Sequence, residues 1–389
     1  MTTNLLYPNW EHLDSHELRI LLGHRIGQPG QHDGIEANPN RLYLPLAGAE
    51  CRVALTFCGR EIVSVEPGQS FDQAQWDAIA NEIETTVLKG PVIIGREYSF
   101  SRHRVQGSWH GPRSGVQILP PHPESPLAPV EMAEHPFILE FPIQKAEFGP
   151  ITNHRRLREH RALTLLLNVL LRSRMNLQPR RAPHFWGMFF REDGGHETRW
   201  VQNSYFGKLG ECVLDAYSHT TDHLLEVIES DSYYTQLMGI DGKGLRVPDD
   251  LDDSICLYQS LARKRRAEFD RMAFWLDNSS RQWEFSMSAS FAALVSAVES
   301  LINQDGRGSK QRFRDFFETY APGATLVDRR SQMYQLRSTI LHGGELMTID
   351  EGIAFGWDPP WWNERALHED LWTVTRIAAR NWLRNPPPV

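Results

Sequence analysis

The chain has 389 residues, a length that favours two domains because single hydrophobic cores stop growing near about 250–300 residues. With 41% hydrophobic and 23% charged residues, the composition excludes wholesale disorder. The 41 Lys and Arg residues against 49 Asp and Glu residues give a formal net charge of −8, which excludes a uniformly basic nucleic-acid coat. The N-terminus lacks the basic flank and apolar core of a signal peptide, and no apolar run reaches the roughly 20 residues of a transmembrane helix. The sequence therefore predicts a cytoplasmic protein with no membrane partner.

Short apolar or β-branched runs bounded by Gly, Pro and Asn predict strands over 41–46, 52–57 and 91–94. Helical spacing of apolar residues predicts a helix over 71–88. Seven of the 24 prolines then fall within 119–142, which predicts a connector or an irregular edge because proline disrupts helices and central strands.

The second half of the chain becomes increasingly helical. An arginine-rich helix is predicted over 153–175, followed by two strands that flank a Gly-Gly turn, 184–190 and 198–205. Beyond residue 250, helices are predicted over 255–276, 285–302, 310–319, 328–342 and 364–383.

These elements indicate an α+β fold. A strand-rich mixed domain, 1–248, with a sub-boundary within 119–150, is expected to precede an all-α bundle, 249–389. Residues 251–389 hold 17 basic and 18 acidic residues, a net charge of −1, which leaves 24 and 31, or −7, for residues 1–250. The acidity therefore belongs to the N-terminal part, and the near-neutral bundle is free to have basic patches.

No pattern in the chain predicts a metal or cofactor site. The four cysteines lack zinc-ligand or CxxC spacing, so we expect reduced, mostly buried thiols. His219 and His223 could share a metal on a helix, but a third ligand is missing, which favours a surface or capping role. Phosphate-loop, GxSxG and HExxH motifs are absent from the sequence.

An arginine five residues before a histidine occurs four times, so the spacing alone selects no site: Arg19/His24, Arg155/His160, Arg191/His196 and Arg337/His342. Only the last pair ends a predicted amphipathic helix that a Gly-Gly stop follows. At helical pitch its two side chains diverge by about 140°, so a shared site needs a distorted last turn or a second subunit.

The segment Arg337-Ser338-x-x-x-His342-Gly343 resembles the HEPN superfamily, and most closely its Apea-like branch. Tyr334 precedes it by three residues, and Glu299 stands before a Leu in an upstream helix, as in that branch, whereas Val298 replaces the usual alanine. The resemblance covers about 255–385. It implies a homodimeric, metal-independent endoribonuclease without cofactors, in which two Arg/His pairs converge in one cleft. It also implies a role in antiviral defence, abortive infection or toxin-type growth arrest, with an antitoxin or a phage-derived trigger as a partner.

The residue types suit RNA cleavage by 2′-OH attack, which leaves 2′,3′-cyclic phosphate ends. His342 can act as general base or acid, Arg337 can bind the phosphate, and Ser338 would be an auxiliary hydrogen bonder. Tyr334 and Glu299 are supporting residues, with Glu299 expected to be an internal partner for an arginine or a helix end. In the alternative reading Arg337 pairs with Glu299 and His342 only caps its helix, so that the protein is an inactive HEPN adaptor that binds RNA or a partner protein. A hydrolase with its chemistry in residues 1–250 is a third reading.

Basic segments of the bundle are candidate RNA contacts, although each is also compatible with a solvated face. The candidate residues are Arg263, Arg265, Arg266, Lys310, Arg312, Arg329 and Arg330. Three tryptophans, 357, 361 and 362, could stack on bases, but core packing or a dimer face is favoured for them.

Overall fold

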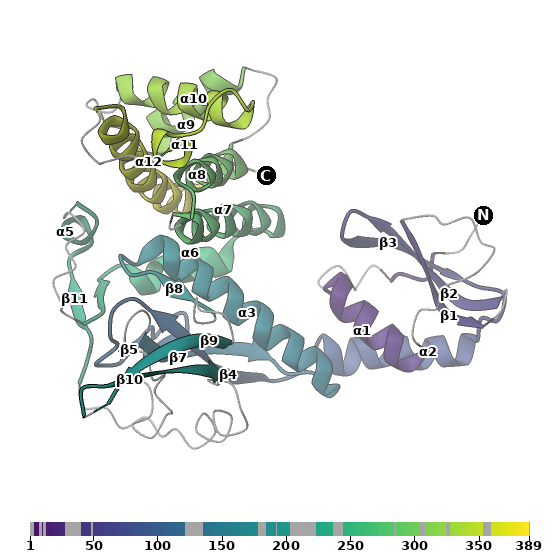
Figure 1. Ribbon diagram of the computed structural model, residues 1–389. Helices are drawn as coiled ribbons and strands as arrows, with labels where there is room; N and C mark the ends of the chain where they lie inside the picture. The colour runs from purple at the N-terminus through teal and green to yellow at the C-terminus, as the bar shows by residue number, and fades with distance from the viewer. Residues whose placement is uncertain are drawn as a thin grey trace. The chain divides into compact units, whose positions relative to one another are not determined.

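The structure analysed is a computed structural model of the chain. It describes residues 4–7, 10, 13–27, 40–47, 50–120, 135–177, 184–191, 193–202, 223–235, 244–283, 285–302, 308–323, 327–352 and 359–388. They belong to two compact units (Figure 1): unit 1 is Met1–Gly95 with Phe141–Glu159, and unit 2 is Arg96–Glu140 with His160–Val389. The fold is α+β, as predicted, with strands concentrated in the N-terminal part and helices in the C-terminal part.

Unit 1 begins with helix α1 (Ser15–Arg25), followed by an antiparallel sheet of order β1-β2-β3. Its strands are β1 (Arg41–Ala47), β2 (Glu50–Cys58) and β3 (Glu61–Pro67). Helix α2 (Gln73–Glu82) continues as a π turn, η2 (Ile83–Val87). The predicted strands 41–46 and 52–57 and the predicted helix 71–88 are confirmed, whereas α1 and β3 were not predicted.

Side-chain caps explain where the two helices of unit 1 start. Asp14 accepts hydrogen bonds from the backbone N–H groups of His16 and Glu17, and Asp72 accepts them from Ala74 and Gln75. Each aspartate satisfies donors that have no partner within the helix and interacts favourably with the helix dipole.

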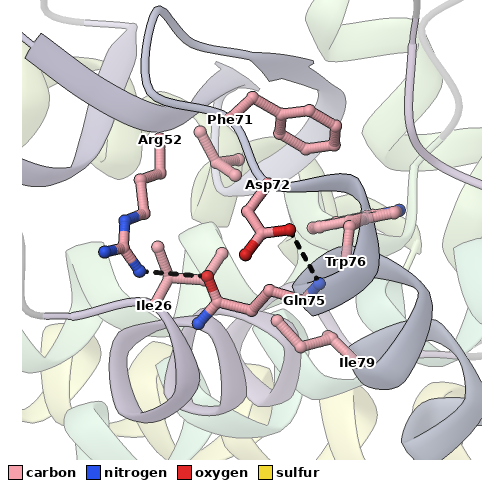
Figure 2. A pocket seen from close by; sticks show the side chains of 8 residues that line it. Ile26, Arg52, Phe71, Asp72, Gln75, Trp76 and Ile79 are labelled. Atoms are coloured by element: carbon pink, nitrogen blue, oxygen red, sulfur yellow. Dashed lines mark hydrogen bonds between the residues drawn. The ribbon is translucent and has the colours of Figure 1, made fainter.

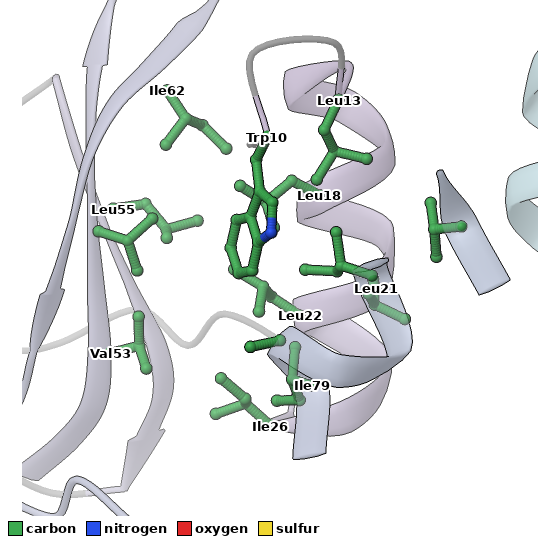
Figure 3. Packing of buried hydrophobic residues seen from close by; sticks show 14 of the residues in the cluster. Trp10, Leu13, Leu18, Leu21, Leu22, Ile26, Val53, Leu55, Ile62 and Ile79 are labelled. Atoms are coloured by element: carbon green, nitrogen blue, oxygen red, sulfur yellow. The ribbon is translucent and has the colours of Figure 1, made fainter. Parts of the chain in front are cut away.

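Figure 3 shows the hydrophobic core of unit 1, in which α1 and α2 face the sheet. Trp10 lies between the sheet residue Leu55 and the α1 residue Leu22, and its side chain is buried. Val53 on β2 and Ile79 on α2 complete the same cluster. Burying side chains of this size stabilises a fold by roughly 1.5–3 kcal/mol each, so this core fixes α1 and α2 against the sheet.

A five-stranded sheet follows, of order β5-β6-β7-β4-β8. Its strands are β4 (Val92–Ser101), β5 (Trp109–His110), β6 (Gln117–Leu119), β7 (His135–Gln144) and β8 (Met175–Asn176). The chain passes between the two units within β4, β7 and α3 (Gly149–Leu170), an arginine-rich helix that confirms the predicted one.

The prediction of a connector or irregular edge over 119–142 was wrong for its C-terminal part. Residues 135–142 belong to β7, the central strand of the five. Pro136 and Pro142 stand near the ends of this strand, and the stretch between them, from Phe137 to Phe141, is buried and free of proline. The proline count therefore concealed a short buried strand whose residues between the prolines are apolar except for Glu140, which pairs with Arg96.

Two smaller pairs of strands complete the mixed part. Strands β9 (His184–Phe190) and β10 (His196–Gln202) form the predicted antiparallel hairpin around Gly194, whose φ of 80° suits glycine. Strands β11 (Glu226–Ile228) and β12 (Arg246–Pro248) pair in parallel, with the short helix α5 (Ser230–Thr235) after β11.

The C-terminal helices agree with the prediction except at their start. They are α6 (Leu251–Ser260), α7 (Arg263–Gln282), α8 (Met287–Leu301), α9 (Ser309–Tyr320), α10 (Val327–Leu341), α11 (Thr348–Glu351) and α12 (Pro359–Arg384). The single helix predicted over 255–276 is wrong: Leu261 and Ala262 adopt extended conformations, with ψ of 134° and 145°, and separate α6 from α7. Apolar residues at helical spacing form a buried stripe on α8: Phe291, Leu294, Val295, Val298 and Leu301.

A buried histidine connects two helices of the bundle. His368 on α12 lies with Nε2 2.7 Å from the Oγ of Ser290 on α8, and its ring contacts that of Trp283 at a centroid distance of 4.4 Å. Burial lowers the pKa of His368 to about 3, so this imidazole is neutral and serves as a structural hydrogen-bonding group.

The boundary predicted between residues 248 and 249 falls inside unit 2. Arg376 on α12 donates hydrogen bonds to the carbonyl oxygens of Val169 and Leu171 at the end of α3. Asn168 Nδ2 donates to Asp277 Oδ1 on α7 at 3.1 Å. These buried polar contacts tie the helical bundle to the C-terminal half of α3. None of the described helices is long and apolar enough to cross a membrane.

Candidate functional site

An ion pair between two neighbouring helices lies at the centre of the candidate site. Arg337 on α10 donates from Nη2 to Oε1 of Glu299 on α8 at 2.6 Å. Glu299 stands two residues before the end of α8 and Arg337 four residues before the end of α10. We expected Glu299 to pair with an arginine of the same chain or with a helix end. Its partner is Arg337, the arginine of the HEPN-like segment.

Tyr334, one turn before Arg337 on α10, covers a second side of the same guanidinium. The Arg337 Cζ lies 5.5 Å from the centroid of the Tyr334 ring, within the range of a cation–π interaction. The Tyr334 ring meets Phe313 of α9 edge-on at 5.7 Å. The Arg337 side chain is only 16% exposed, and its Nε is buried without a hydrogen-bond partner in the described part of the chain. Glu299 and Tyr334 thus fix the orientation of Arg337 and restrict access to it.

His342 ends the same helix and is exposed. Its backbone N–H donates to the Ser338 carbonyl at 3.1 Å, which adds a residue to the last turn of α10. Gly343 has a φ of 69°, and the N–H groups of Gly343 and Gly344 donate to the carbonyls of Ile340 and Thr339. This is the glycine-dependent helix stop that the sequence predicts. Within the described residues, the His342 ring has no hydrogen bond and is open to solvent.

Arg337 and His342 do not meet within one chain. Because the turn that ends at His342 stays helical, the two residues are separated by about 140° around the axis and about 7.5 Å along it. Their side chains share no hydrogen bond. The half-buried Ser338 is adjacent to Arg337 in the chain and contributes its carbonyl to the last turn. One copy of the chain therefore positions the arginine and the histidine on different sides of α10.

Two of the predicted RNA contacts are wrong because the side chains are buried. Arg330 is 2% exposed and donates from Nη2 to the Ala321 carbonyl at 2.7 Å. Arg265 is 4% exposed and donates to the carbonyls of Pro387 and Pro388 and, at 2.5 Å, to Glu268. Both guanidinium groups bind backbone carbonyls and so stabilise the fold. The local sequence does not distinguish an arginine with this structural role from one that binds phosphate.

The other predicted contacts reach the surface. Arg329 pairs with Asp370 at 2.6 Å, Arg266 lies 4.6 Å from the ring centroid of Tyr258, and Arg312 donates to Ser309 at 3.3 Å. Arg263 and Lys310 are exposed. The part of these five residues in RNA binding stays a prediction.

The tryptophans near the start of α12, which are candidates for stacking on bases, also differ in exposure. Trp362 is exposed, and Trp361 is half-buried with the Arg365 guanidinium 5.4 Å from its ring centroid. Trp357 lies outside the described residues. Of the two described tryptophans, Trp362 is the more exposed, and its ring contacts that of Trp361 edge-on at 4.7 Å.

The other three Arg/His pairs with the same spacing have separate local roles. Arg155 forms a buried ion pair with Glu17, whereas the buried His160 contacts Ser99. Arg19 and Arg191 pair locally, with His16 and Asp193. None of these arginines is therefore available with its histidine as a joint site.

Among the described residues, no cluster of His, Cys, Asp or Glu is suited to hold a metal ion. His223 is exposed, whereas His219 and Cys212 lie outside the described part. The other cysteines are free thiols, but the expectation that they are mostly buried was wrong: Cys51 and Cys256 are half-buried and Cys58 is exposed.

A small hollow in unit 1 offers no second candidate (Figure 2). It lies between the β2 residue Arg52 and the first turn of α2. Arg52 Nη1 donates to Gln75 Oε1 at 3.0 Å, and Gln75 Nε2 donates to the Arg25 carbonyl at 2.8 Å. Asp72 is occupied as the cap of α2. The polar groups that line the hollow are therefore hydrogen-bonded within the protein, as expected for a structural contact.

The sequence did not reveal a second group of ionisable side chains, which lies in unit 1 between α1 and α3. There Asp14, His16 and Glu17 meet His154 and Arg158. Because α1 was not predicted as an element, no sequence signal indicated that these distant residues come together.

Comparison with known proteins returned no match among protein-family models, curated proteins or solved structures.

Proposed function

We propose that the C-terminal helical bundle is a HEPN-type endoribonuclease that cleaves RNA without a metal ion. The observation that carries the proposal is the exposed imidazole of His342 at the end of α10, the helix that also carries an arginine whose orientation Glu299 fixes. The resemblance of this helix to the HEPN motif and the placement of Glu299 beside Arg337 support it further.

In this mechanism the ribose supplies the nucleophile. His342 accepts the 2′-OH proton as the oxygen attacks the adjacent phosphorus, and a water molecule donates a proton to the departing 5′-oxygen. The P–O5′ bond breaks and a 2′,3′-cyclic phosphate forms. Arg337 stabilises the charge on the phosphorane, and Ser338 assists by hydrogen bonding. Contributions of this kind are each worth on the order of a few kcal/mol.

The proposed enzyme is a homodimer. Because Arg337 and His342 point to different sides of α10, a phosphate that contacts both requires a second bundle to supply one of them. The near-neutral charge of the bundle, −1 over residues 251–389, presents little electrostatic repulsion to such pairing. The N-terminal part would recognise a trigger or substrate, and the activity would act in antiviral defence or toxin-type growth arrest.

The test is RNA cleavage by the purified protein in the presence of EDTA. We expect products with 2′,3′-cyclic phosphate and 5′-hydroxyl ends, and no cleavage of a matched substrate that carries 2′-deoxyribose throughout. Cleavage of the deoxy substrate, or products with 2′-hydroxyl and 3′-hydroxyl ends, would contradict 2′-OH attack.

The second candidate is an inactive HEPN adaptor that binds RNA or a partner protein. The specific observation in its favour is that Arg337 is paired with Glu299 and only 16% exposed. RNA that binds without being cut in the EDTA assay, at any protein concentration, would select the adaptor.

Replacing Glu299 with Gln tests how the ion pair affects RNA. The amide oxygen can still accept the hydrogen bond from Arg337, but a negative charge no longer competes with the phosphate. We expect RNA affinity to rise about two- to fivefold, because a partly exposed ion pair is worth about 1 kcal/mol or less. Binding is measured by fluorescence anisotropy at fixed salt.

Glu345→Gln is the matched control, because it removes the same charge from an exposed position beyond α10. It should leave the affinity near that of the wild type. A loss of affinity in Glu299→Gln would instead mean that the carboxylate charge is needed to orient Arg337.

A further inference from the structure

We propose that the contact between α1 and the first half of α3 is a pH-sensitive latch, which loosens when His16 and His154 take up protons. Both helical segments belong to unit 1, so the latch is built within one compact unit. It is independent of the proposed RNA chemistry.

The two histidines face each other across the helix pair. The rings of His16 on α1 and His154 on α3 lie with their centroids 4.5 Å apart and their planes inclined by 35°. Arg19 Nη2 lies 2.9 Å from His16 Nδ1. A guanidinium can only donate, so this nitrogen accepts the hydrogen bond in the closed contact. Protonation of His16 at Nδ1 would replace this hydrogen bond with two opposed donors.

Both carboxylates of the contact are already paired with arginines, without the histidines. On α1, Asp14 and Glu17 are the acidic groups, and Arg158 Nη1 reaches both, at 3.1 and 3.2 Å. Glu17 also holds Arg155 at 2.5 Å, and these two side chains are buried. His154 Nε2 lies 3.7 Å from Asp14 Oδ1, beyond hydrogen-bonding distance.

Three arginines therefore stand against two carboxylates in the closed contact: Arg19, Arg155 and Arg158 against Asp14 and Glu17. Two imidazolium ions would raise the balance from one excess positive charge to three. Like charges about 4–5 Å apart repel, most strongly where water is partly excluded. His154 also lies in the second turn of α3, close to the positive end of the helix dipole.

The pKa shifts of His154 and Asp14 agree with this repulsion between like charges. Burial lowers the pKa of His154, and His16 and Arg158 lower it further against the opposing pull of Asp14 and Glu17. Burial acts to raise the pKa of Asp14, but Arg158 and the backbone N–H groups of its helix cap outweigh it and hold that pKa below its usual value. Asp14 thus stays ionised throughout the range in which histidine titrates.

The direction of the pH effect follows from linkage. A histidine whose pKa is lower in the folded state binds fewer protons there than in the unfolded chain, so stability falls as the pH drops below the unfolded value near 6.5. The contact is therefore expected to be closed at neutral pH and to weaken progressively below about pH 6.5. Loosening it frees α1, whose Leu18, Leu21 and Leu22 pack in the core of unit 1.

The test is hydrogen exchange of the full-length protein between pH 7.5 and 5.5, expressed as protection factors so that the intrinsic pH dependence of exchange is removed. We expect the protection of α1 amides to fall about tenfold or more, which corresponds to about 1.4 kcal/mol. The protection of α8, in unit 2, should stay constant and serves as the internal reference.

The variants separate the latch from other causes. The double variant His16→Gln with His154→Gln should show no fall in α1 protection, and His154→Arg, which carries a permanent charge, should already show low protection at pH 7.5. His24→Gln is the matched control, since His24 lies on the same helix but stacks on Phe148 instead of facing the other two histidines, and it should keep the full pH response. A wild-type α1 that is insensitive to pH, a double variant with the wild-type response, or loss of the response in His24→Gln would each overturn the proposal.

Discussion

Replacing Arg337 and His342 with alanine is expected to reduce metal-free RNA cleavage by roughly 10²–10⁴-fold for each residue, the usual effect of losing a general acid–base group or a charge-stabilising donor. The arginine loss removes the phosphate contact and the histidine loss removes proton transfer. Single-turnover cleavage of a labelled RNA in EDTA measures both. The bundle should stay folded, because His342 is exposed and Arg337 contributes a partly exposed ion pair with Glu299 and a cation–π contact with Tyr334, each worth about 1 kcal/mol or less.

The chain contains a matched control for these variants. Arg191 and His196 have the same spacing and are exposed around the β9–β10 turn. Replacing both with alanine makes the same change in composition and charge at a site to which we assign no chemistry. Equal cleavage rates in all variants and in the wild type would remove Arg337 and His342 from the catalytic site.

A mixing experiment tests whether the site is shared between subunits. If the arginine of one copy works with the histidine of the other, mixing inactive Arg337→Ala and His342→Ala proteins would restore one intact site in each mixed dimer. About half of the dimers would be mixed after full exchange, so a readily measurable fraction of the wild-type rate should return. A mixture as inactive as its components would contradict a composite site, as would a protein that is monomeric throughout the active concentration range.

Local patterns predicted most of the helices and several strands because those elements bury one side of a regular repeat. The α8 stripe is the simplest case, since every apolar residue at helical spacing between Phe291 and Leu301 is buried. The errors occurred where position in the fold overrides composition. The segment around strand β7 is rich in proline, but the five residues between Pro136 and Pro142 are buried, and four of them are apolar. The corner between α6 and α7 contains no glycine or proline that would predict it.

The candidate site shows a similar limit. The sequence placed Glu299 on one predicted helix and Tyr334 and Arg337 on another, and the structure brings these three together. The sequence could not distinguish the roles of Arg329 and Arg330, which are adjacent in the chain. Arg329 forms a surface ion pair, whereas Arg330 is almost fully buried. On a helix, consecutive residues point about 100° apart, so the burial of one arginine says little about its neighbour. Only tertiary packing decides which guanidinium is available to a phosphate.

The buried ion pair of unit 1 carries the second large prediction. Arg155 donates to Glu17 from Nε at 3.0 Å and from Nη2 at 2.5 Å, with side chains 9% and 2% exposed. Glu17→Ala would leave Arg155 buried without its main counterion, which is expected to cost about 3–5 kcal/mol of unfolding free energy. Chemical denaturation followed by circular dichroism, with hydrogen exchange to localise the change to α1, measures it.

Two further variants show whether burial is the cause. Glu82→Ala breaks the more exposed bidentate pair between Arg25 and Glu82 in the same unit, and it should cost no more than about 1 kcal/mol. Glu17→Leu combined with Arg155→Met removes both buried charges and should recover most of the loss. Recovery should be incomplete, because Arg155 Nη1 also donates to the carbonyls of Val87 and Gln144, which would lose their donor. If Glu17→Ala and Glu82→Ala lower the unfolding free energy by the same amount, burial of the Arg155 charge is not the cause of the loss in Glu17→Ala.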